Sequence, residues 1–260
     1  MASTVLPKSV VAPRQGIEGR FYFRMAVACI TVAVIGFVPT YWVPMFRGTL
    51  EMPPLVHVHA FFFYAWTVLF LRQTWLAAAG RLDRHREWGV AGVALATGMV
   101  FVGLAMTIHS LERMTAAGMG DVGRAFSIVS ASAIALFAGL FTVAVRNVRR
   151  PEIHKRVMLV ATISLLQAAV GRWFVVFLAT PGPTGGVAAP PPLPVTVIPG
   201  LLADLPIVIA MVHDRRTRGR VHGAYWIAGG VVLAVQVLRV PFATTAAWTA
   251  MAESLLALAP

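Results

Sequence analysis

Seven stretches of this sequence are apolar enough and long enough to cross a lipid bilayer, and this limits the fold more than any other feature. A helix needs about 20 residues to cross the hydrocarbon core. Hydrophobic residues make up 58% of the chain and charged residues 12%, which leaves little sequence for a water-soluble domain. The sequence therefore predicts an all-α fold, an integral membrane bundle of seven transmembrane helices. The predicted spans are residues 21–43, 55–79, 87–109, 125–146, 156–180, 195–213 and 223–245.

The segments outside these spans are predicted to be short. Residues 1–20 contain basic residues and prolines but no apolar core, so we interpret them as a cytoplasmic polar tail and not as a cleavable signal peptide. Residues 21–245 form the predicted transmembrane domain, and residues 246–260 form a short external tail. Segment 181–194 is rich in proline and glycine, which predicts an extended loop between the fifth and sixth spans.

The distribution of Lys and Arg predicts the orientation. One side of the predicted bundle carries 17 of the 22 basic residues and the other side three, while Arg172 and Arg239 fall inside spans. Because basic residues favour the cytoplasmic side, we expect the amino terminus inside and the carboxy terminus outside. The net charge of +12 is then an orientation signal and gives no indication of nucleic-acid binding. We expect a multi-pass protein of the bacterial inner membrane, with its basic loops on anionic lipid headgroups.

A short pattern recurs where three of the spans begin on the basic side. An arginine precedes a histidine by four residues, and successive histidines are 69 and 68 residues apart. This spacing predicts an internal repeat of one leading helix followed by three helical hairpins. The pairs are Arg81 with His85, Arg150 with His154, and Arg218 with His222.

Charged residues inside spans are candidates for a functional site because each is costly in a bilayer. Arg172 and Arg239 are expected at similar depth in the outer half, where the alternative is that each reaches out to the headgroups. Asp204 is the only acidic residue in a predicted span and the natural partner for one of them. Pro199 and Pro206 predict a kink in the helix around Asp204.

Histidines mark both ends of the bundle. His59 begins the second span and His109 ends the third, and we expect them at one depth on the outer side. Residues at helical spacing from His59 form one face of the second span, and this face ends at Gln73. Each histidine has the alternative role of an interfacial residue or a helix end. On the basic side, the imidazoles of a second group would bind zinc if they converged, but the neighbouring arginines favour a basic belt against lipid headgroups. This group is His85, His154, His213 and His222.

Several of these motifs resemble known families. One resemblance is to a group of uncharacterised bacterial multi-pass membrane proteins. The residues that carry it are His57, His59, Gln73, the Arg81 to Gly89 segment, Pro151-Glu152-Ile153-His154-Lys155-Arg156 and the Arg218 to His222 segment. A more remote resemblance is to the cytochrome b561 and ferric reductase proteins. It rests on a histidine at one end of a helix followed by a His-Arg pair at the start of the next helix. That resemblance implies haem b held by paired histidines and electron transfer across the bilayer.

Four functions therefore remain open from the sequence. An electron-transfer protein would use His59 and His109 as haem ligands, with Arg172 or Arg239 on the propionates. A transporter or sensor would use Arg172, Arg239 and Asp204 as an anion or proton site. A zinc hydrolase, by resemblance to the alkaline ceramidase and adiponectin-receptor group, would use His59, His109 and Asp204. The fourth is an accessory subunit that binds partner membrane subunits and has no chemistry of its own.

Overall fold

The fold is a helical membrane bundle. The computed structural model describes residues 12–178 and 189–259, with the backbone alone for residues 12–18, and this part of the chain contains helices and no β-strand. Seven helical segments are long and apolar enough to cross a membrane, which confirms the predicted number. The elements are α1 (Ala12–Gly36), the π-helix η1 (Val38–Trp42), α2 (Val43–Phe46), α3 (Pro54–Ala78), α4 (Leu82–Ala116), α5 (Gly120–Arg146), α6 (Pro151–Ser164), α7 (Leu166–Leu178), the 3₁₀ helix η2 (Leu193–Thr196), α8 (Val197–Ala203), α9 (Leu205–Arg218), α10 (Gly223–Phe242) and α11 (Ala246–Leu256).

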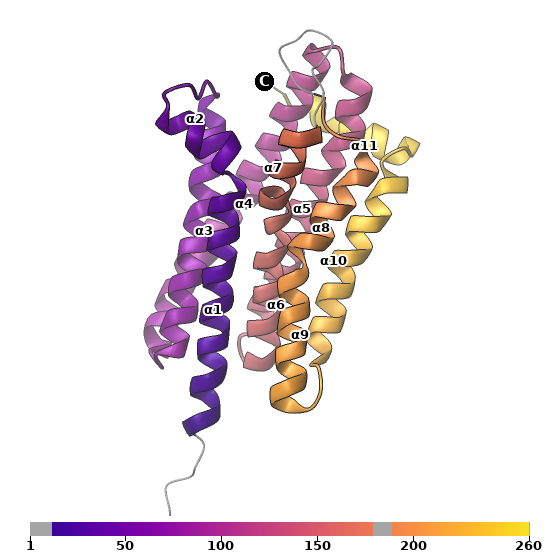
Figure 1. Cartoon of the computed structure of the whole chain (residues 1–260). Helices are drawn as coiled ribbons and strands as arrows, with labels where there is room; N and C mark the ends of the chain where they lie inside the picture. The colour runs from indigo at the N-terminus through magenta and orange to yellow at the C-terminus, as the bar shows by residue number, and fades with distance from the viewer. Residues whose placement is uncertain (1–11, 179–188, 260) are drawn as a thin grey trace, which may run out of the picture.

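The long helices run up and down side by side (Figure 1). The turns α3–α4, α5–α6 and α9–α10 lie together at the end where α1 begins, and we call this the basic end because the arginine-rich segments fall there. The α4–α5 turn, α2 and α11 lie at the opposite end (Figure 1). Helix α6 is the centre of the bundle, since Leu159, Val160, Ala161 and Ile163 are all fully buried.

The ends of several helices differ from the predicted spans. Helix α1 begins at Ala12, inside the predicted polar tail, and residues 1–11 lie outside the described residues. Residues 246–260, the predicted external tail, contain α11, whose Trp248 is buried and donates a hydrogen bond to the backbone carbonyl of Arg124 at the start of α5. Most of the predicted loop 181–194 lies outside the described residues, and its last two residues open η2.

Two of the spans are interrupted. The sixth span breaks at Asp204, where α8 ends and α9 begins with Pro206 in its first turn, so the predicted kink is confirmed. The fifth span breaks at Leu165, between α6 and α7, where the sequence contains no proline. At both interruptions the backbone makes tighter turns, with hydrogen bonds from Leu165 to the Thr162 carbonyl and from Ile207 to the Asp204 carbonyl.

Glycines allow close contacts between neighbouring helices. A Cβ at Gly98 of α4 would come within 2.2 Å of the Phe62 ring of α3. A Cβ at Gly103 would come within 2.4 Å of Ile134 of α5. Helix α4 therefore packs against both neighbours through positions where any side chain larger than hydrogen would collide.

The Arg–His pattern has a structural cause in two of the three hairpins. Arg81 and Arg150 are the residues that precede α4 and α6, and the histidine four residues later donates its backbone N–H to the arginine carbonyl, at 3.0 Å in both cases. The His85 and His154 rings also contact backbone carbonyls of the preceding helices, at Gln73 (3.2 Å) and Ala144 (2.9 Å).

The third hairpin differs. Arg218 ends α9, and His222 caps α10 by accepting a hydrogen bond from the Ala224 backbone N–H. Each of the three histidine rings therefore contacts a backbone group near a helix end, and their predicted contact with lipid headgroups stays a prediction. A threefold repeat stays a prediction.

Candidate functional site

Arg239 of α10 is the centre of a buried polar network. Its side chain is 4% exposed, and its guanidinium donates hydrogen bonds to Gln167 Oε1 (3.2 Å), Thr196 Oγ1 (3.0 Å) and the Thr196 carbonyl (3.2 Å). Gln167 and Thr196 are themselves buried and are joined by a 3.4 Å hydrogen bond. All of these acceptors are neutral. Arg239 is therefore a buried cation that lacks a carboxylate partner among the described residues.

The network continues to Asp204 through α10. Gln236, one turn before Arg239, is 2% exposed, and its side chain lies near the Asp204 carboxylate. Asp204 Oδ1, Gln236 Oε1 and Arg239 Nε are buried and have no hydrogen-bond partner in the described part of the chain. Buried polar atoms are normally paired, so three in one region indicate that the network is incomplete as it stands.

Helix interruptions position the members of this network. Gln167 is the second residue of α7, directly after the break at Leu165, and Thr196 precedes the first residue of α8. Asp204 lies at the α8–α9 break. Broken helices inside a membrane bundle are a common way of building binding sites, because the ends provide unpaired backbone groups.

The predicted pairing of Asp204 with an arginine is wrong. The described ion pairs do not include Asp204, Arg172 or Arg239. The two arginines also lie on different sides of α7. Gln167 of α7 contacts Arg239, whereas the Arg172 guanidinium lies 5.5 Å from the centre of the Phe37 ring, on the side of His59. Arg172 is exposed at the surface of the bundle.

His59 and Arg172 therefore form a second, smaller cluster. The His59 ring packs against Phe63 at 4.2 Å, and His59 Nδ1 is buried without a partner among the described residues. Sequence analysis placed both residues in the outer half, and the structure brings them together. It does not bring either of them to Arg239.

His109 does not lie opposite His59. The contacts between α3 and α4 join residues whose numbers sum to about 160: Gln73 with His85, and Phe62 with Gly98. In this register the residue opposite His59 is near position 101, so His109 lies about two turns, or ~12 Å, farther along α4. Two axial ligands of one haem must face the same iron from opposite sides. The pair His59 and His109 does not fit a shared haem, which corrects the prediction that they lie at one depth.

The proposed zinc ligands are not assembled either. No group of three His, Cys, Asp or Glu side chains in the described residues is close enough to hold a metal ion. His59 packs on Phe63 and Asp204 on Gln236, so these members of the predicted zinc set have different neighbours. At the basic end, His85 and His154 lie 6.4 Å apart, while His213 stacks on Phe21.

Sequence analysis missed the strongest electrostatic feature, a buried ion pair at the basic end. Arg156 was assigned to the belt of headgroup contacts, but it is 1% exposed and forms a bidentate pair with Asp214, at 2.9 Å and 2.6 Å. Arg156 also binds Glu152 at 2.8 Å, and Arg218 bonds the same carboxylate. The pair joins α6 to α9. Asp214 stands one residue beyond the predicted sixth span, which is why it was not considered.

Gln167, Thr196 and Gln236 were also missed, although a simple signal was available. All three are polar residues within predicted spans, where amide and hydroxyl groups need partners as much as charges do. A search restricted to ionisable residues overlooks them. Comparison with known proteins adds no further residues, since no family model, curated protein or solved structure matches this chain.

Proposed function

We propose that this protein is a membrane transporter that binds a small anion at the Arg239 network. The observation that carries this proposal is a fully buried guanidinium whose hydrogen-bond acceptors are all neutral. An arginine inside a membrane costs about 2.5–3.5 kcal/mol on insertion scales. A bound anion would supply the missing counter-charge, and Arg239 Nε is a donor available to it.

Asp204 supports a transport role for the same region. Its carboxylate lies on the Gln236 side of the network, so it is a negative group near an anion site without occupying that site. A charge of this kind would weaken anion binding when ionised and strengthen it when protonated. Binding sites at interrupted helices between parts of a bundle are typical of transporters.

Thermal unfolding of the purified protein in detergent tests the proposal. Formate, nitrate and chloride would each be titrated against gluconate at constant ionic strength. We expect at least one small anion to stabilise the protein with a saturable dependence, reaching about 2.7 kcal/mol at 100 times its dissociation constant. Uptake of that anion by proteoliposomes would then separate a transporter from a sensor.

Two variants make the test specific. Arg239→Gln removes the buried charge and should abolish the saturable stabilisation. Arg172→Gln removes an equal charge from the exposed side of α7 and should preserve it. Equal responses of the wild type and Arg239→Gln to every anion would refute the proposal.

A further inference from the structure

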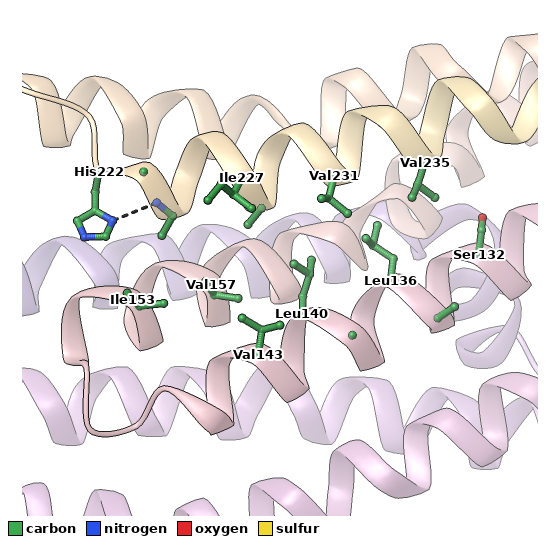
Figure 2. Close-up of a pocket in the computed structure, with 15 residues that line it drawn as sticks. Ser132, Leu136, Leu140, Val143, Ile153, Val157, His222, Ile227, Val231 and Val235 are labelled. Carbon is green, nitrogen blue, oxygen red and sulfur yellow. Dashed lines mark hydrogen bonds between the residues drawn. The ribbon is translucent and has the colours of Figure 1, made fainter.

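A long apolar groove follows the outside of α5 and α10, and Arg239 lines only the section of it that lies farther from the basic end. In the half of the bundle near the basic end it has a volume of about 760 Å³ and is lined by α5, α6 and α10. Figure 2 shows Leu136, Leu140 and Val143 of α5 facing Ile227 and Val231 of α10 across it. A second section of about 710 Å³ continues toward the opposite end and shares Ser132, Ala135, Val231 and Val235 with the first.

The first section has the depth of one leaflet of a bilayer. Its lining on α5 runs from Val143 to Ser132, which is 12 residues with a rise of about 16 Å along the helix. The hydrocarbon core of a bilayer is about 30 Å thick, so one leaflet occupies about half of that. The lining is aliphatic except for His222 at the basic end and Ser132 at the end farthest from it. These are the dimensions and the chemistry of a site for a lipid acyl chain.

The mouth of this section is positively charged. On α5 the lining residues recur every three or four positions, and Arg146 continues the same face one turn beyond Val143. Arg150 precedes α6 three residues before the lining residue Ile153, and Arg220 stands in the α9–α10 turn, two residues before His222.

These cations are free to bind a ligand. Arg146, Arg150 and Arg220 are exposed, and none of them forms an ion pair within the described residues. The neighbouring carboxylates, Glu152 and Asp214, are already occupied by Arg156 and Arg218.

We propose that this groove binds one anionic phospholipid. Its phosphate would lie between the α5–α6 and α9–α10 turns, where Arg146, Arg150 and Arg220 supply positive charge. One acyl chain would extend along α5 and α10 to the level of Ser132. The charge at the mouth selects an anionic headgroup over a zwitterionic one, and its position at the basic end selects a lipid of the leaflet on that side.

Native mass spectrometry of the purified protein tests this site. Phosphatidylglycerol and phosphatidylcholine with identical chains would be added in equal amounts. Each interfacial arginine contributes about fivefold to the affinity for an anionic headgroup. We therefore expect strong preference for phosphatidylglycerol, and we expect Arg146→Gln/Arg220→Gln to reduce that preference by about 30-fold. The matched control is Arg81→Gln/Arg84→Gln, which removes two arginines from the α3–α4 turn instead.

A second pair of variants tests the chain-binding part. Gly139 lines the groove, and a Cβ there meets nothing within 4 Å, so Gly139→Phe would fill the groove without disturbing the helix contacts. Gly171 of α7 is equally open and lies outside the groove lining, which makes Gly171→Phe the control. Thermal unfolding would verify that every variant is folded.

The expected result is loss of the retained lipid in the groove variants and its retention in both controls. The proposal would be overturned by equal retention of the two lipids by the wild type, by loss of lipid in the controls to the same extent, or by unchanged binding in Gly139→Phe. Retention of a free fatty acid or formation of a dimer through this face would also overturn it. None of these outcomes depends on the anion site at Arg239.

Discussion

The buried pair between Arg156 and Asp214 should be the most sensitive electrostatic contact in the molecule. Both side chains are almost completely buried, and two hydrogen bonds of 2.9 Å and 2.6 Å join them. Asp214 also accepts the backbone N–H of His222 at 3.2 Å, so the pair links the end of α9 to the start of α10. Removal of either partner leaves a charged group where water cannot reach it.

The size of the effect should depend on which partner is removed. Arg156→Met leaves the Asp214 carboxylate with only the His222 N–H and Arg218, whose Nε is 3.9 Å away, and should cost about 3–5 kcal/mol. Asp214→Asn leaves a neutral acceptor, and Arg156 keeps Glu152 at 2.8 Å, so we expect about 1–3 kcal/mol. In the double variant the buried charge disappears together with its partner.

Unfolding in mixed detergent micelles, followed by tryptophan fluorescence, measures these free energies. The double variant should be more stable than the sum of the single effects predicts, by at least about 1 kcal/mol. The exposed pair of Arg86 with Asp83 is the matched control, and Arg86→Met and Asp83→Asn should each change stability by no more than about 1 kcal/mol. Additive effects at Arg156 and Asp214 within about 0.5 kcal/mol would show that the two charges are not coupled and would refute this reasoning.

Three further predictions concern packing, pH and orientation. Gly103→Ala should destabilise the protein by about 1–3 kcal/mol because its Cβ would collide with a side chain of α5. Gly139→Ala should stabilise it by about 0.5–1 kcal/mol, since that Cβ meets nothing, and the same unfolding assay compares the two. Burial and the Arg156 charge lower the pKa of His222 below its ordinary value of 6.5, so the unfolded chain binds this proton first and stability should fall as the pH drops below about 6.5. His222→Asn keeps a capping acceptor for α10 and should reduce the difference between melting temperatures at pH 5.5 and pH 7.5; an unchanged difference would exclude His222 as its source. Reporter fusions at residues 83, 151 and 217 should be cytoplasmic and a fusion at residue 260 external, and cytoplasmic activity of the last would contradict the expected orientation.

Much of the fold could be predicted from the sequence because membrane insertion depends on local properties. Length and apolarity alone decide whether a segment can span the bilayer, and each of the seven spans has both. The interruption at Asp204 was predictable for the same reason, since Pro206 cannot donate the backbone hydrogen bond that a continuous helix requires. The interruption at Leu165 has no such residue, and it was not predicted.

The candidate site could be predicted only in part. The sequence indicated that Arg239 and Asp204 lie within the membrane, because a charge inside an apolar run is visible without knowledge of any neighbour. It did not indicate that Arg239 binds Gln167, 72 positions away, or that Asp204 lies near Gln236. The depth of each residue in the membrane could be predicted from its position in a span, but the residue that it contacts could not.

Tertiary structure decided those partners through the order and register of the helices. A span fixes how far a side chain lies along the membrane normal, but it leaves the rotation of each helix and the identity of its neighbours open. The contacts of α3 with α4 set His109 about two turns away from the level of His59, and the packing of α6 against α9 buries Arg156 beside Asp214. The sequence by itself thus determined a bundle of seven membrane helices, because the bilayer acts on each segment separately. Which polar groups meet was decided only by packing, because a contact between two helices depends on the shapes of both.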